Sequence, residues 1–151
     1  MRQTTLWMIV KWNKILLCMK KRWFWEWLWN WAGWKCEKNE SINEAMIREL
    51  FEETKLKTTN NDIENYWLLH FIFEGNSDWN QDVNIFKINN FTWIPTETEE
   101  MKPNWFEIDK IPYDKMWEDD KIWLPEFLSG EKVEYEFVFW LDWKIKSYKK
   151  Y

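Results

Sequence analysis

Residues 34–56 read WKCEKNESINEAMIRELFEETKL, and this stretch carries the strongest structural signal in the chain. Ser41 and Glu44 form a capping box, in which each side chain accepts a hydrogen bond from the backbone N–H of the other residue. The apolar residues that follow recur at helical spacing. The stretch therefore predicts a helix that begins at Ile42 and ends near Thr54.

Three glutamates lie beside the apolar side of this helix: Glu49, Glu52 and Glu53. Like charges three or four residues apart repel by about 0.2–0.5 kcal/mol per pair, so we expect a cation to offset them. Carboxylate oxygens suit Mg²⁺ or Mn²⁺, which leave coordination sites for water and substrate phosphates. The alternative is an acidic helix face that surface lysines neutralise.

With glycine in place of Trp34, the spacing of the whole stretch resembles the Nudix box. Five residues separate Trp34 from Glu40, seven separate Glu40 from Arg48-Glu49, and two separate Glu49 from the Glu52-Glu53 pair. Lys55 stands where the family pattern has glycine. The resemblance implies an α+β fold, a Nudix-type α/β/α sandwich around a mixed β-sheet, and a hydrolase that uses Mg²⁺ or Mn²⁺.

The resemblance also implies which residues carry the chemistry. Arg48 would orient the glutamates through charge-assisted hydrogen bonds. Either Glu49 or Glu53 would take the proton of the attacking water, and the choice between them stays open. The metal ligands would be Glu49, Glu52, Glu53, Glu100 from a later loop, and the main-chain carbonyl of Gly33 or Trp34.

Tryptophan and glycine occur in unusual proportions, with 16 tryptophans and 3 glycines, whereas glycine ordinarily makes up ~7% of a protein. Trp12-Asn13 and Asp142-Trp143 lie between apolar runs, where hairpin turns favour glycine. We hypothesise that the genome reads the UGA codon as glycine and that these tryptophans are mistranslations of that codon. The positions concerned are 12, 23, 25, 27, 31, 34, 79, 93, 140 and 143. Trp29, Trp105, Trp117 and Trp123 are interpreted as genuine, and Trp7 and Trp67 are left open.

A literal interpretation of the tryptophans gives a different protein. Alternate residues from Trp23 to Trp31 would share one face of a strand, as an aromatic surface for sugars or a membrane interface. At ~1–3 kcal/mol each, ten bulky residues in places made for glycine would cost more than a typical stability of about 5–15 kcal/mol. A literal chain is therefore expected to fold poorly.

Two further blocks, the second of them wholly outside the box, resemble the Nudix branch that hydrolyses oxidised purine nucleoside triphosphates such as 8-oxo-dGTP and 2-hydroxy-dATP. They span residues 19–35 and 100–123. The resemblance implies nucleotide-pool sanitation and these substrate contacts: Thr5, Lys20, Asn30, Lys35, Trp117, Asp119 and Asp120. The alternatives are another nucleotide, such as a dNTP or a nucleoside diphosphate derivative, and a non-catalytic aromatic-rich binding module.

Composition limits the remaining possibilities. The length of 151 residues suits one domain over residues 1–151, and a net charge of -5 argues against a nucleic-acid polymer as partner. Two cysteines fit a reducing cytoplasm. No apolar run is long enough for a membrane span, and the N-terminus does not resemble a signal peptide. The resemblance implies a monomer, and His70 is interpreted as structural.

The other expected elements follow from periodicity and turn residues. Pro125 is expected to kink the second helix or limit its length. We expect a hairpin over 4–10 and 14–19, strands at 66–74, 82–88 and 104–108, a second helix over about 119–129, and a final hairpin over 133–140 and 144–149.

Overall fold

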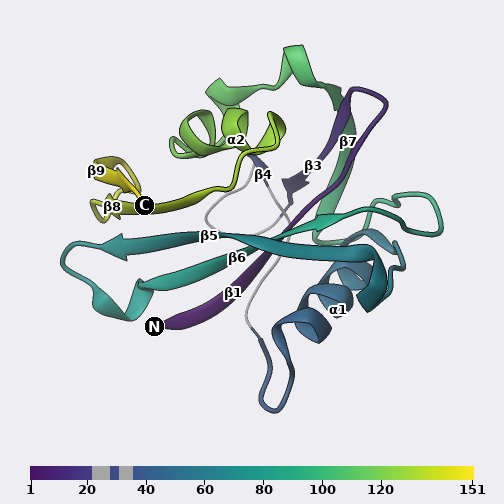
Figure 1. Ribbon diagram of the computed structural model, residues 1–151, viewed down its shortest axis with the longest axis horizontal. Helices are drawn as coiled ribbons and strands as arrows, with labels where there is room; N and C mark the ends of the chain where they lie inside the picture. The colour runs from purple at the N-terminus through teal and green to yellow at the C-terminus, as the bar shows by residue number, and fades with distance from the viewer. Residues whose placement is uncertain (22–27, 31–35) are drawn as a thin grey trace.

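The computed structural model describes residues 1–21, 28–30 and 36–151. Two α-helices and nine strands lie in this part of the chain (Figure 1). The helices are α1 (Ile42–Thr54) and α2 (Asp120–Leu128). The strands are β1 (Arg2–Met8), β2 (Val10–Lys11), β3 (Lys14–Lys20), β4 (Trp29–Asn30), β5 (Ile63–Phe73), β6 (Gln81–Ile88), β7 (Met101–Glu107), β8 (Glu134–Phe139) and β9 (Ile145–Lys150).

The main sheet has five strands in the order β1-β6-β5-β8-β9. Its β1–β6 and β5–β8 pairs are parallel, whereas β5–β6 and β8–β9 are antiparallel. A smaller antiparallel sheet joins β2, β3 and β4, and β7 pairs with β3. The expectation of a mixed sheet is confirmed.

The two helices lie on opposite sides of the main sheet (Figure 1). On one side, Met46 and Leu50 of α1 pack with Trp7 in a buried cluster. On the other side, Trp123 and Phe127 of α2 belong to a separate apolar cluster. Alternate residues of each strand face opposite sides of a sheet, so one sheet can supply both cores. This arrangement confirms the predicted α/β/α sandwich.

Helix α1 has the predicted bounds because its signals are local. The Glu44 backbone N–H donates to Ser41 Oγ at 3.1 Å, and the Ser41 N–H donates to Glu44 Oε2 at 2.8 Å. At the other end, Lys55 has a left-handed backbone with φ of 65° and donates its N–H to the Phe51 carbonyl at 2.8 Å. Lys55 thus adopts the conformation for which the family uses glycine, at a cost of ~1–2 kcal/mol.

The first predicted hairpin needs a correction. Residues 2–8 pair with β6, and only the short strand Val10–Lys11 forms a hairpin with β3. Alternation explains this, because Leu6 and Met8 face one core and Trp7 faces the other, which a two-stranded hairpin cannot cover. The β7 strand also starts at Met101, earlier than predicted.

The second helix and the final hairpin agree closely with the expectations. Helix α2 ends before Ser129-Gly130, and Pro125 lies within it without ending it. Strands β8 and β9 form the C-terminal hairpin. Within the described ranges, no helix has the length and apolar character that crossing a membrane requires.

The backbone conformation at four of the tryptophans named in the glycine hypothesis is informative. The backbone φ angles are positive at Trp12 (49°), Trp93 (79°) and Trp143 (66°), the left-handed region that favours glycine. Asn13 has φ of 61°, so the turn between β2 and β3 has positive φ at both central residues, as a type I′ turn requires. The connection between β5 and β6 at Trp79 is instead a 3₁₀ helix without positive φ, so the backbone conformation there does not favour glycine.

Candidate active site

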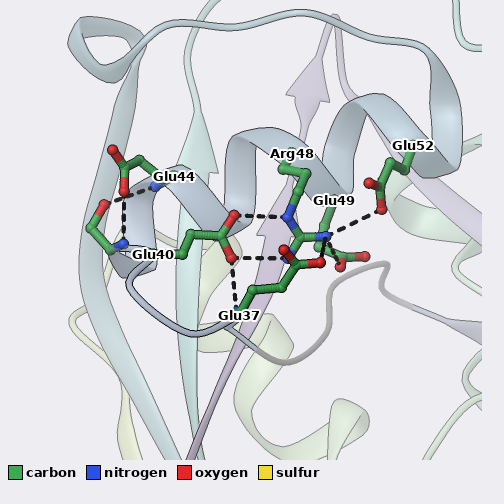
Figure 2. Close-up of polar contacts among 7 residues, drawn as sticks. Glu37, Glu40, Glu44, Arg48, Glu49 and Glu52 are labelled. Atoms are coloured by element: carbon green, nitrogen blue, oxygen red, sulfur yellow. Dashed lines mark hydrogen bonds and ion pairs between the residues drawn. The ribbon is translucent and has the colours of Figure 1, made fainter.

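Arg48 lies at the centre of an acidic cluster on α1 and the segment before it (Figure 2). Its Nε and Nη2 donate to the two carboxylate oxygens of Glu40 at 2.7 and 3.0 Å. Its Nη1 donates to Glu49 Oε1 at 2.6 Å and to Glu52 Oε2 at 3.2 Å. A more distant ion pair joins Nη1 to Glu37 at 3.8 Å. Arg48 therefore holds the carboxylates of Glu49 and Glu52, two of the metal ligands that the resemblance implies.

Glu53 is the most deeply buried carboxylate of this cluster. Burial, with the neighbouring charge of Glu49, raises the pKa of Glu53 to about 8. The indole N–H of Trp7 lies nearby and partly opposes this rise in the Glu53 pKa, without forming a full hydrogen bond to the carboxylate. Among the described residues, nothing hydrogen-bonds to Glu53 Oε2. An oxygen of this carboxylate is thus held out of water without a hydrogen-bond partner in the described part of the chain.

Glu49, Lys20 and Glu100 complete the electrostatic environment. Burial raises the pKa of Glu49, and the Arg48 hydrogen bond opposes that shift. Burial lowers the pKa of Lys20, while the charges of Glu53, Glu100 and Glu49 act in the opposite direction. The end of β3 and the loop before β7 therefore lie close enough to the α1 carboxylates for their charges to interact.

The donor set fits a hard divalent cation. Glu49 and Glu53 present carboxylate oxygens from one helix face, and the buried Glu53 Oε2 lacks any compensating donor. Residues 1–21, 28–30 and 36–151 contain no group of three His, Cys, Asp or Glu already arranged as a metal site. Of the four carboxylates expected to bind a metal, those of Glu49 and Glu52 accept hydrogen bonds from Arg48. A cation could therefore compensate the buried charge, with ligand rearrangement around it.

A second pair of buried acids lies at the start of α2, on the opposite side of the main sheet. Asp119 and Asp120 are both almost inaccessible to water. Burial raises the pKa of Asp119 to about 7, and the Trp123 indole N–H donates to its Oδ2 at 3.0 Å, which lowers the pKa in part. Asp119 does not cap the helix through its side chain. It can therefore be protonated or ionised near neutral pH, and so can donate or accept a hydrogen bond.

Aromatic rings extend from this pair along the sheet. Trp117 contacts Trp143, with ring centroids 4.7 Å apart, and Trp143 contacts Phe73 at 4.4 Å. The Trp143 indole thus fills space beside Trp117 that a glycine would leave open. A flat ring next to buried acids is suited to stacking on a heterocyclic base.

The remaining sequence-predicted residues lie in different places. Thr5 is buried on β1, where strand alternation puts it on the Trp7 side of the sheet, away from Asp119. Asn30 lies on β4, opposite Cys18 of β3. The predictions for Gly33, Trp34 and Lys35 concern positions outside the described residues.

The sequence interpretation missed two residues that organise the site. Glu37 joins Glu40 through its backbone N–H, which donates to Glu40 Oε2 at 2.9 Å. Thr98 donates its hydroxyl to the Glu53 main-chain carbonyl at 3.1 Å. No spacing rule reveals the Thr98 contact, because it depends on how the loop before β7 folds against α1.

Comparison with known proteins gives consistent results. Residues 1–127 match the family model described as the NUDIX domain. Zebrafish (Danio rerio) oxidized purine nucleoside triphosphate hydrolase is 39% identical over 128 residues, which cover 85% of this chain and 80% of the relative. The mouse (Mus musculus) protein of the same name is 36% identical over 147 residues, covering 97% and 92%. A crystal structure of a mutator MutT protein from Bacillus halodurans has a TM-score of 0.85 at 25% identity, covering 99% of this chain and 97% of that one.

Proposed function

The chain belongs to the Nudix hydrolase family, and we propose that it is a Mg²⁺-dependent pyrophosphohydrolase of oxidised purine nucleoside triphosphates. The products would be the nucleoside monophosphate and pyrophosphate. The observation that carries the metal-dependent chemistry is the buried Glu53 carboxylate, whose Oε2 lacks a donor, beside glutamates that Arg48 orients. The names of the zebrafish and mouse relatives support the substrate class.

The reaction needs a water oxygen to bond to phosphorus while the bridging P–O bond between the α- and β-phosphates breaks. A divalent cation, when bound, would neutralise phosphate charge and lower the pKa of the attacking water. Glu49, Glu52, Glu53 and Glu100 would hold it, together with the main-chain carbonyl of residue 33 or 34. Glu49 or Glu53 would accept the water proton, and Lys20 would offset phosphate charge from the end of β3.

Base recognition would use the buried acids and the ring next to them. A protonated Asp119 can donate to a purine carbonyl, whereas an ionised Asp120 can accept from ring and exocyclic N–H groups. Trp117 would stack on the base, a contact worth ~1–3 kcal/mol in related base–aromatic pairs. Asn30, Lys35 and Thr5 remain proposed contacts on the basis of the family resemblance.

The test measures hydrolysis by the full chain with and without Mg²⁺, as pyrophosphate release from 8-oxo-dGTP, 2-hydroxy-dATP and dGTP and as AMP release from ADP-ribose. We expect the two oxidised nucleotides to give the highest kcat/KM and metal-free protein to be inactive. Glu53→Gln should abolish turnover, whereas Glu64→Gln on β5 should retain it. A preference for dGTP or ADP-ribose would refute the substrate class, and an active Glu53→Gln variant would refute the metal assignment.

We also propose that the natural protein has glycine at positions 12, 93 and 143. Their positive φ angles support this, as does the exposure of Trp12 (86%) and Trp93 (70%), which leaves little packing to favour an indole. Each left-handed tryptophan costs ~1–2 kcal/mol, and glycine removes that cost. Exposure alone supports glycine at 79 and 140, and positions 23, 25, 27, 31 and 34 lie outside the described residues.

The two undecided tryptophans have the opposite environment. Trp7 and Trp67 are buried within strands, and the Trp67 Nε1 donates to the Glu131 carbonyl at 3.0 Å. We infer that both are genuine. Sequencing the gene tests the whole set: UGA codons at 12, 93 and 143 with UGG at 7 and 67 would support recoding, and UGG at all five would end it. Intact mass spectrometry of the protein from its own organism gives an independent measurement.

We further propose that the chain is a single Nudix domain over residues 1–151 and acts as a cytoplasmic monomer. Buried Cys18 and the partly exposed Cys36 are both free thiols, which suits a reducing compartment. Size-exclusion chromatography with light scattering would test the monomer, because a dimer would double the measured mass.

A further inference from the structure

Thr98 connects three segments around the acidic cluster. It lies in the loop between β6 and β7, and its hydroxyl donates to the Glu53 main-chain carbonyl at 3.1 Å. The same oxygen lies within accepting distance of the backbone N–H groups of Met101 (3.2 Å) and Glu100 (3.4 Å). A threonine hydroxyl has one donor and two acceptor positions, so these contacts use its full capacity. The Thr98 side chain thereby joins the last turn of α1 to the backbone of Glu100.

The backbone of Thr98 and the end of β3 strengthen this connection. Thr98 N–H donates to the Met101 carbonyl at 2.9 Å. Lys21 donates its backbone N–H to the Glu100 carbonyl at 2.9 Å and its Nζ to the Thr98 carbonyl at 2.9 Å. An ion pair at 2.7 Å also joins Lys21 Nζ to Glu97. The loop is thus fixed both to α1 and to the strand end that carries Lys20.

Glu100 itself depends on this arrangement for its position. It lies on an exposed loop, where the backbone is ordinarily more mobile than in helices and strands. Glu49 and Glu53, in contrast, are set by the helix. A ligand set needs its members held to within about 0.5 Å, so a loop carboxylate requires supporting contacts that helix carboxylates already have.

We propose that Thr98 is a positioning residue, whose hydroxyl sets the Glu100 carboxylate against Glu49 and Glu53 for divalent-cation binding. This inference rests on the proposed metal-dependent function. Removing the hydroxyl leaves the loop attached through its backbone contacts and Lys21, so the fold persists while Glu100 loses its fixed distance to α1. Thr98 touches neither substrate nor cation, and its effect passes through Glu100.

The test compares Thr98→Val, which keeps the side-chain shape, with Thr98→Ser, which restores the hydroxyl. Mn²⁺ binding to the metal-free full chain, measured by electron paramagnetic resonance, is the readout. Loss of supporting contacts around metal ligands typically weakens affinity ~10- to 100-fold, so we expect about a tenfold loss for Thr98→Val and near-parent affinity for Thr98→Ser. Thr58→Val is the matched control, because Thr58 also donates its hydroxyl to a loop carbonyl, that of Asn90, at 2.7 Å.

A double-mutant comparison tests the route. Glu100→Gln should weaken Mn²⁺ binding, and adding Thr98→Val should weaken it no further. Unchanged affinity in Thr98→Val, an equal loss in Thr58→Val, or a full additional loss in the Glu100→Gln background would each overturn the inference while leaving the proposed function intact. A parent protein that binds no Mn²⁺ and hydrolyses none of the nucleotides would overturn the proposed function itself, and this inference with it.

Discussion

Replacing tryptophan by glycine should have opposite effects at two kinds of position. At Trp12 the substitution removes a left-handed indole with φ of 49°, which relieves ~1–2 kcal/mol. The loss is an exposed cation–π contact with Lys11 Nζ, 5.5 Å from the ring centroid, worth ~0.5–1 kcal/mol. The net expectation is a gain of about 0.5–1 kcal/mol.

Trp93 gives a similar sum. Its φ is 79°, and its contact with Lys57 Nζ, at 5.7 Å from the centroid, is exposed. The double variant Trp12→Gly/Trp93→Gly should therefore gain about 1–2 kcal/mol, because the two turns are separate. For a chain of this length that gain raises Tm by about 2–8 °C.

Trp67→Gly is the matched comparison, since it makes the same chemical change at a buried site. Trp67 is 8% exposed, donates to the Glu131 carbonyl and packs against Phe127 with centroids 4.7 Å apart. Truncation of such a ring costs ~3–5 kcal/mol or more. Guanidinium unfolding followed by far-UV circular dichroism measures all variants, because that signal arises mainly from the peptide backbone. Destabilisation of the double variant by as much as Trp67→Gly would refute the assignment of glycine to the turns.

Three further predictions address the acids and the helix. In the metal-free protein the raised pKa of Glu53 favours the protonated folded state. The contribution of Glu53 to the unfolding free energy should therefore be highest below about pH 4.5 and should fall as the pH rises towards about 8. Denaturation at a series of pH values should give a flatter profile for Glu53→Gln, and an unchanged slope would contradict this. Asp119→Ala should lower kcat/KM for 8-oxo-dGTP more than kcat/KM for dGTP, so the ratio of the two should fall. Competing-substrate assays measure this ratio, and an unaltered ratio would exclude Asp119 from base recognition. Ser41→Ala should lower the unfolding free energy by ~1 kcal/mol without changing KM, because it removes a helix cap that is not among the proposed substrate contacts. Calorimetry and steady-state kinetics measure the two effects, and a raised KM would show that the cap also shapes the site.

The sequence predicted what local contacts decide. The bounds of α1 follow from Ser41 and Glu44 at one end and from the left-handed Lys55 at the other, all within one short segment. The cluster around Arg48 was predictable for the same reason, since Glu49 and Glu52 are its neighbours on one helix.

The rest depended on contacts between distant segments. Strand β1 was assigned to a hairpin because the sequence of residues 4–10 does not show that β6 offers it a longer partner. Thr98 was missed because its partners, Glu53 and Met101, meet it only when the loop folds against α1. Trp7 and Trp67 were left undecided because burial, which separates them from Trp12, is a property of the fold.

The parallel pairing of β1 with β6 affects when the first strand can fold during synthesis. Arg2 pairs with Gln81, a separation of 79 residues (81 − 2). At synthesis rates of about 5–20 residues per second, the first strand waits roughly 4–16 s before its neighbour in the sheet has been made. During that interval Leu6, Trp7 and Met8 have no sheet to join, so this nascent segment is a natural binding site for chaperones that recognise short apolar stretches.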